Sequence, residues 1–181
     1  MVPAPHLVER FARDLDALIA PGKRVGIAVS GGPDSLALLL LAAAARPGKI
    51  EAATVDHGLR PESRAEAKMV QGVCDSLRVP HLTLAAEWQE KPTTAIQERA
   101  RTERYRLLSG WVQGRELDGL ATAHHADDQA ETFLMRLSRG AGVRGLAGMR
   151  SASNVPGREV MLLRPVLGWR RDERQHQIRN Q

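Results

Sequence analysis

The feature that most constrains the fold is one six-residue segment, Ser30-Gly31-Gly32-Pro33-Asp34-Ser35, which we call the glycine turn. A short apolar run, residues 25–29, comes just before it, and a long aliphatic run, residues 36–45, comes just after it. The first run has the length of a buried strand, and the second is long enough to form a helix. We therefore predict that the glycine turn leads directly from a strand into a helix.

The residue types of the glycine turn indicate an anion site. Two glycines allow backbone angles that are closed to other residues, and they let a ligand approach the backbone. Pro33 suits the first helical turn, where its missing N–H needs no partner. Free N–H groups and the positive end of the helix dipole then face outward, an arrangement that binds anions. The competing interpretation is an ordinary Gly-Gly turn before an acidic first helical turn.

Two common phosphate motifs are excluded. No Lys-Ser or Lys-Thr follows the glycines at the spacing of a Walker A loop, and G-x-G-x-x-G does not occur in this turn. Asp34 lies in the predicted first helical turn, where its carboxylate would repel a phosphate unless a divalent cation lay between them. Carboxylate and phosphate oxygens are ligands that suit Mg²⁺. The pattern therefore favours a phosphate ligand with Mg²⁺ held at Asp34.

Strands and helices alternate along the whole chain. Besides the strand and helix around the glycine turn, we predict strands at residues 50–56, 81–85, 120–123 and 159–163. Helices are predicted at residues 6–20, 61–78, 93–112 and 126–137, the third of them capped by Thr93 and Thr94. This order predicts a doubly wound α/β fold, with a mainly parallel five-stranded sheet and helices on both faces. Ligands bind such sheets at the carboxyl ends of the strands, where the glycine turn, Asp56-His57 and His124-His125 all fall.

Composition limits the class of protein. The 181 residues suggest one domain with a substantial core. A net charge of +5 and a pI near 10.1 favour phosphate-bearing partners, whereas 3% aromatic residues argue against base-stacking platforms. The single cysteine, Cys74, excludes an internal disulfide and a multi-cysteine metal site, and it suits a reducing cytosol. Because the apolar run 36–45 is too short to span a bilayer, we predict a cytoplasmic protein without a membrane partner.

Two groups of ionisable residues carry candidate chemistry. In the run 124–132, Asp128 and Glu131 are three apart and share a helix face, where they can hold Mg²⁺ or act as a base. The alternative for this run is an ordinary helix N-terminus with flanking histidines and acidic residues in its first turn. A zinc site is disfavoured because adjacent histidines point apart. Arg101 and Arg104 also share a face, and guanidinium groups match phosphate or pyrophosphate. The alternative for them is a solvated helix face with weak ion pairs.

The glycine turn resembles the signature S-G-G-x-D-S of the PP-loop ATPase family. Members of this family cleave ATP between the α and β phosphates and adenylate a substrate. Residues 55–63, 122–132 and 139–149, together with the helix at 98–105 and Arg164-Pro165, resemble one branch of the family, the tRNA(Ile)-lysidine synthetases. Their order and spacing agree with that branch over most of residues 24–170.

This resemblance implies an adenine nucleotide α-hydrolase-like fold and a two-step ligase reaction. ATP adenylates the C2 oxygen of the wobble cytidine in an isoleucine tRNA with a CAU anticodon. The ε-amine of free lysine then displaces AMP and forms lysidine. The implied cofactors are ATP and Mg²⁺, the implied partners are tRNA(Ile) and lysine, and an oligomer is compatible with the resemblance.

The resemblance also implies roles for individual residues, carried over by position. The implied ATP-binding residues are Ala28, Ser30, Gly31, Gly32, Pro33, Asp34, Ser35, Asp56, His57 and His124. The implied catalytic residues are Asp34, Arg101, Arg104, Asp128 and Glu131, of which the last two hold or deprotonate the lysine ammonium. Contacts with tRNA or substrate are implied for Arg139, Arg144 and Arg164.

The end of the chain departs from the family pattern. We expect residues 1–170 to form the catalytic domain and residues 171–181 a charged tail that starts a linker to tRNA-binding domains. On this hypothesis the chain binds ATP but modifies tRNA poorly alone. One alternative is another PP-loop adenylating enzyme such as a tRNA thiolase, although Cys74 alone cannot supply a Cys-x-x-Cys pair. A second alternative is a non-catalytic ATP-binding module, which has no use for Asp128, Glu131 and Arg104.

Overall fold

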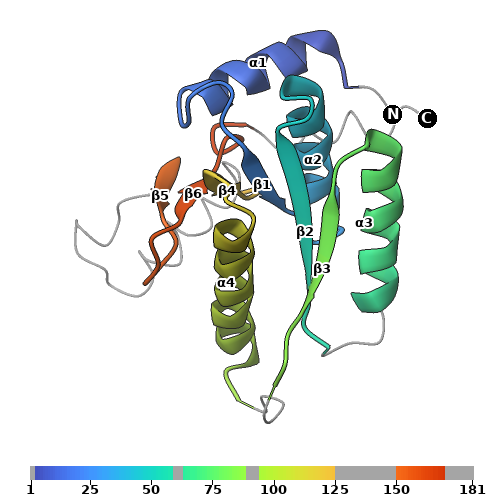
Figure 1. Ribbon diagram of the computed structural model, residues 1–181, viewed down its shortest axis with the longest axis vertical. Helices are drawn as coiled ribbons and strands as arrows, with labels where there is room; N and C mark the ends of the chain where they lie inside the picture. Colours follow the sequence, from blue (N-terminus) through green and yellow to red (C-terminus); the bar gives the residue numbers. More distant parts are fainter. Residues whose placement is uncertain (1–2, 59–62, 89–93, 125–149, 170–181) are drawn as a thin grey trace.

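A computed structural model describes residues 3–58, 63–88, 94–124 and 150–169 of the chain. Its sheet has six strands in the order β3-β2-β1-β4-β6-β5 (Figure 1). The strands are β1 (Val25–Ala28), β2 (Ile50–Asp56), β3 (His81–Ala85), β4 (Gly119–Ala121), β5 (Ala152–Asn154) and β6 (Met161–Leu163). Five of them pair in parallel, as predicted, and β5 pairs antiparallel with β6. The prediction of five strands therefore missed the short edge strand β5.

Helices cover both faces of the sheet, which confirms the doubly wound fold (Figure 1). They are α1 (Pro5–Asp16), α2 (Pro33–Ala45), α3 (Ser63–Leu77) and α4 (Ile96–Gly114). The first three pack on one face and α4 on the other. The chain steps from β1 to β2 and β3, and then returns to place β4 on the other side of β1. This reversal opens a crevice at the carboxyl ends of β1 and β4, where ligands of such folds bind.

Two helix ends differ from the prediction. Helix α1 ends at Asp16, four residues before the predicted end at residue 20. Helix α4 has Ala95 as its N-cap, with φ of 48° and no side-chain capping bond, so the predicted threonine cap is wrong. The predicted helix 126–137, the loop 139–149 and the tail 171–181 lie outside the described residues.

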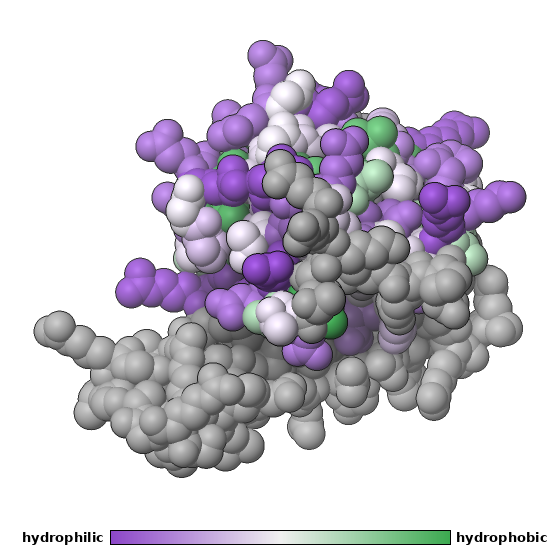
Figure 2. All heavy atoms as spheres, turned by 90° about the horizontal axis from the view of Figure 1, so that it is seen from below, coloured by the Kyte–Doolittle hydropathy of each residue, from purple (hydrophilic) through white to green (hydrophobic). Residues whose placement is uncertain are grey.

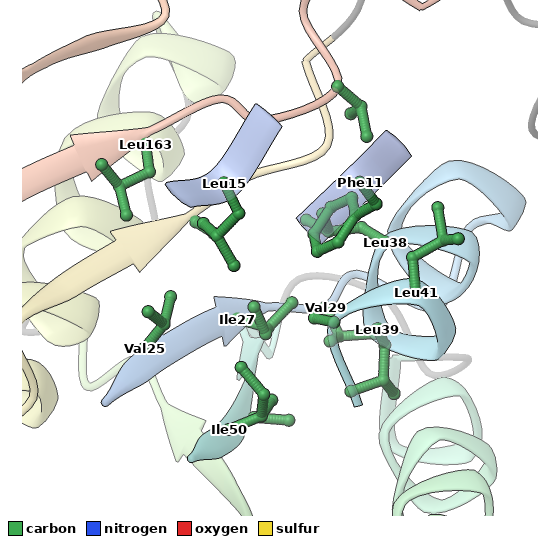
Figure 3. Packing of buried hydrophobic residues seen from close by; sticks show 14 of the residues in the cluster. Phe11, Leu15, Val25, Ile27, Val29, Leu38, Leu39, Leu41, Ile50 and Leu163 are labelled. Atoms are coloured by element: carbon green, nitrogen blue, oxygen red, sulfur yellow. The ribbon is translucent and has the colours of Figure 1, made fainter. Parts of the chain in front are cut away.

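The larger hydrophobic core lies between β1 and the helices of one face (Figure 3). Phe11 and Leu15 of α1 pack over Leu38 of α2 and Ile27 of β1, and all four side chains are fully buried. Helix α2 is apolar on nearly every side because α1 covers the part that the sheet does not. Cys74 is also fully buried, and burial raises the pKa of its thiol to about 11, which supports the predicted core role.

A second core lies between the sheet and α4. In this core, Gly26 of β1 packs closely against the ring of Trp111 in α4. A Cβ at Gly26 would lie 2.6 Å from Cζ3 of Trp111. We expect Gly26→Ala to lower the free energy of unfolding by about 1–3 kcal/mol, because the ring cannot move without disturbing a packed core. Urea denaturation measures this change. Gly72→Ala in α3 is the control, since a Cβ there meets nothing within 4 Å, and equal stability of the two variants would contradict the packing.

Within the described ranges, no helix is both long and apolar enough to cross a membrane.

Candidate active site

A cavity of about 1040 Å³ lies at the carboxyl ends of β1, β2 and β4. Figure 2 views the molecule from the side at which β2 and β3 end, and most of the described residues that it colours there are hydrophilic. The glycine turn forms one wall and α4 forms the opposite wall, while the ends of β2 and β4 and the start of α3 complete it. From the predicted ATP-binding set, the lining includes Ala28, Ser30, Gly32, Pro33, Asp34, Ser35, His57 and His124.

The two glycines of the turn have different roles. Gly31 has φ of +86°, the left-handed region that the sequence analysis expected, and it does not line the cavity. Gly32 has φ of −71° and ψ of 158°, angles open to any residue, so the expectation of special backbone angles is wrong for Gly32. It is the N-cap of α2, lines the cavity, and would place a Cβ near only Ser30 Oγ, at 3.6 Å. Its missing side chain therefore leaves the helix N-terminus open to a ligand.

Ser35 holds the glycine turn in shape from within. Its hydroxyl donates to the carbonyl of Gly32 at 2.9 Å and accepts from the backbone N–H of Ser30 at 3.1 Å. The hydroxyls of Ser30 and Ser35 are 3.2 Å apart. Because Ser35 is 5% exposed and closes the turn on itself, it organises the wall of the cavity more than it offers a free group to a ligand.

Asp34 lies in the first turn of α2 and lines the cavity, as predicted. The described residues contain no group of three or more His, Cys, Asp or Glu side chains that could enclose a metal ion. Mg²⁺ does not need such a cage, because it keeps several waters and takes one or two carboxylates together with substrate phosphates. A single carboxylate in the first turn of α2, at the cavity wall, therefore fits the expected Mg²⁺ site.

Arg104 projects from α4 into the cavity wall that faces the glycine turn. Its guanidinium carbon lies 5.4 Å from the ring centroid of Tyr105, and within the described part of the chain no carboxylate forms an ion pair with it. By contrast, Arg24 and Arg115 at the amino ends of the strands both bind Glu51. Arg101 also contacts the Tyr105 ring, at 5.3 Å, but it is exposed and does not line the cavity.

The end of β2 forms a tight turn around Asp56. The Asp56 carboxylate accepts hydrogen bonds from the backbone N–H of Gly58 at 2.8 Å and from the hydroxyl of Ser63 at 2.6 Å. These two hydrogen bonds hold the pKa of Asp56 below its usual value, and the bond from Ser63 has the larger effect. Asp56 does not line the cavity, whereas His57 does. The structure thus places Asp56 as the organiser of the turn that presents His57.

Thr54 is a cavity residue that the sequence analysis missed. It is 4% exposed, lines the cavity, and lies 2.9 Å from His81 Nε2 through its hydroxyl. His81 Nδ1 lies 2.7 Å from the side-chain oxygen of Gln71, so Nδ1 donates and Nε2 accepts from Thr54. Burial lowers the pKa of His81, which favours this neutral form. The sequence feature that could have indicated Thr54 as a site residue is its position as the one polar residue in the otherwise apolar run 52–55.

Of the remaining predicted site residues, the structure describes His124 and Arg164. His124 lines the cavity, and its Nδ1 lies 2.8 Å from the hydroxyl of Thr122. Arg164 is 9% exposed and does not line the cavity; its guanidinium donates to the carbonyl of Arg150 and the hydroxyl of Ser153. Outside the described residues lie Asp128, Glu131, Arg139 and Arg144. Their placement relative to Asp34 stays a prediction.

Sequence comparisons identify relatives over most of the chain. The PP-loop domain model matches residues 6–181. A tRNA(Ile)-lysidine synthase of Novosphingobium aromaticivorans is 56% identical over 165 residues, covering 91% of this chain and 50% of the relative. A tRNA(Ile)-lysidine synthase of Zymomonas mobilis is 49% identical over 150 residues, covering 82% of this chain and 45% of the relative. The chain thus spans about half the length of the curated relatives it matches.

Solved structures share the fold at low sequence identity. The U34-tRNA thiolase NcsA from Methanococcus maripaludis has a TM-score of 0.72 at 17% identity, over 93% of this chain and 62% of that one. An NH3-dependent NAD synthetase from Campylobacter jejuni has a TM-score of 0.60 at 13% identity, over 93% of this chain and 69% of that one. Given the match of the PP-loop domain model from residue 6 to residue 181, the chain belongs to the PP-loop family.

Proposed function

We propose that the chain is the ATP-binding and adenylating part of a tRNA(Ile)-lysidine synthase. The observation that carries this proposal is one cavity whose walls bring together the N-terminus of α2, Asp34 and Arg104. Relatives 56% and 49% identical to the chain carry that name. Two segments that resemble the lysidine synthetase branch also reach this cavity, the first through Val55 and His57 and the second through residues 122–124. The substrates we propose are ATP, lysine and the wobble cytidine of tRNA(Ile).

In the proposed first step, the C2 oxygen of cytidine attacks the α-phosphorus of ATP and pyrophosphate leaves. The open N–H groups and the dipole of α2 at Gly32 bind the polyphosphate. Arg104 stabilises the negative charge that develops on the transferring group and on the leaving pyrophosphate. Its position opposite the glycine turn supports this role, because charge is then met from two sides of the cavity.

In the proposed second step, the ε-amine of lysine attacks C2 of the activated cytidine, and AMP leaves with the C2 oxygen. From the family resemblance, Asp128 and Glu131 hold the lysine ammonium and accept its proton. Asp34 would hold Mg²⁺, which neutralises phosphate charge when it is bound. His57 and His124, both in the cavity wall, are proposed to contact the nucleotide.

Exchange of labelled pyrophosphate into ATP, in the presence of tRNA(Ile), tests the adenylation step. We expect Asp34→Ala to reduce exchange by about 100-fold, because the carboxylate in the cavity is lost. Glu98→Ala is the matched control, since Glu98 also lies in a first helical turn but is exposed and outside the cavity. Equal loss in both variants would contradict the assignment. ATP binding without exchange in the wild type would favour either a non-catalytic module or a need for tRNA-binding domains outside this chain.

A further inference from the structure

A short continuation of β3 runs along the turn that follows β2. The backbone N–H of Ala86 donates to the carbonyl of Asp56 at 2.8 Å, one residue beyond the last strand pair. Trp88 then donates from its indole Nε1 to the carbonyl of His57 at 2.7 Å. Two successive carbonyls of the turn are therefore fixed by one neighbouring segment, the second of them through a side chain.

This contact lies at the wall of the cavity. His57 lines the cavity, and fixing its carbonyl sets the orientation of the peptide group between His57 and Gly58. His57 thus lines the cavity while its carbonyl is held by Trp88.

Trp88 differs from the other two tryptophans of the chain. Trp111 and Trp169 are 6% and 1% exposed and belong to the two hydrophobic cores. Trp88 is only partly buried and belongs to neither core cluster. Its one polar atom, the indole Nε1, donates a hydrogen bond to a cavity residue. The core packing of the sheet does not explain this placement, whereas a need to hold the His57 turn does.

We propose that Trp88 is a positioning residue for nucleotide binding. Its indole N–H holds the His57 turn in the orientation that meets the nucleotide, so it sets ATP affinity without touching the reacting atoms. This inference rests on the proposed function only in taking ATP as the occupant of the cavity.

The test is calorimetric titration of ATP and Mg²⁺ into the wild-type chain and into Trp88→Phe, which keeps an aromatic ring and removes the donor. Loss of one neutral hydrogen bond is expected to raise the Kd for ATP by about three- to tenfold. Leu82→Ala is the control, because Leu82 is an exposed residue of β3, the strand that precedes Trp88, and lies outside the cavity. Its Kd should match that of the wild type.

A chemical variant separates positioning from packing. β-(3-Benzothienyl)alanine at position 88 keeps the shape of the bicyclic ring but replaces N–H by sulfur, so it should raise Kd as much as Trp88→Phe does. ATP should also change the fluorescence of the wild type, and this change should be lost in Trp88→Phe, although Trp111 and Trp169 remain. An unchanged Kd in both variants, while the wild type binds ATP, would overturn this inference alone. No ATP binding by the wild type would overturn the proposed function as well.

Discussion

Arg104→Met is expected to slow ATP–pyrophosphate exchange by about 100- to 1,000-fold, the largest effect that we predict for a single side chain in α4. Arg104 lines the cavity opposite the glycine turn, and no described carboxylate neutralises it. On the proposed function, its charge is therefore available to the phosphates as negative charge develops during transfer. Methionine keeps much of the unbranched side chain against Tyr105, so the loss reports on charge and not on packing.

Arg101→Met provides the matched control for this experiment. Arg101 contacts the same tyrosine ring at a similar distance, 5.3 Å against 5.4 Å, but it is exposed and outside the cavity. We expect its exchange rate to stay within about threefold of the wild type, the effect of a screened surface charge. If Arg101→Met and Arg104→Met lost equal activity, the cavity would not be the site of phosphate charge stabilisation.

Gly32→Ala is expected to weaken ATP binding by about 10- to 100-fold, equivalent to about 1.4–2.8 kcal/mol, with little change in protein stability. The backbone angles at Gly32 suit alanine, and the new methyl group would have only Ser30 Oγ within 4 Å, at 3.6 Å. The methyl group would instead occupy the cavity wall at the N-terminus of α2, where we propose that phosphate oxygens approach the backbone. Titration calorimetry and urea denaturation measure the two quantities.

Gly31→Ala should instead lower protein stability and leave ATP binding little changed. Its φ of +86° places alanine in the left-handed region, at a cost of about 1–2 kcal/mol in the free energy of unfolding. The added Cβ would make ordinary contacts, the nearest at 3.5 Å to Met69, so strain and not collision is the cause. A stable Gly31→Ala protein together with an unstable Gly32→Ala protein would reverse our assignment of the two glycines.

The sequence was sufficient to predict the parts of the fold that depend on local patterns. Apolar runs identified the five parallel strands, and Pro33 indicated where α2 begins. Apart from Gly31, the glycine turn lies with His57 and His124 at one cavity, because parallel strands bring their carboxyl ends to one edge. The roles of these residues in binding stay predictions. Strand β5 was missed because Ala152, Ser153 and Asn154 carry no apolar alternation, and its pairing depends on β6 nearby.

Contacts between distant segments could not be predicted from local patterns. The bond from Thr54 to His81 joins residues 27 apart, and the bond from Trp88 to His57 joins residues 31 apart. Both depend on β2 and β3 being adjacent in the sheet, which sequence periodicity does not specify. The difference between Arg101 and Arg104 has a similar origin, since only the packing of α4 against the sheet decides which of the two reaches the cavity.

The burial of Cys74 gives the chain a practical property. A thiol with no exposed surface and a pKa of about 11 supplies almost no thiolate to maleimide reagents near neutral pH. Because it is the only native cysteine, spectroscopic labels can be attached at chosen positions without first removing it. A cysteine introduced beside the cavity would therefore carry a single dye or spin label, and the movements of its walls could be followed in the otherwise unaltered polypeptide.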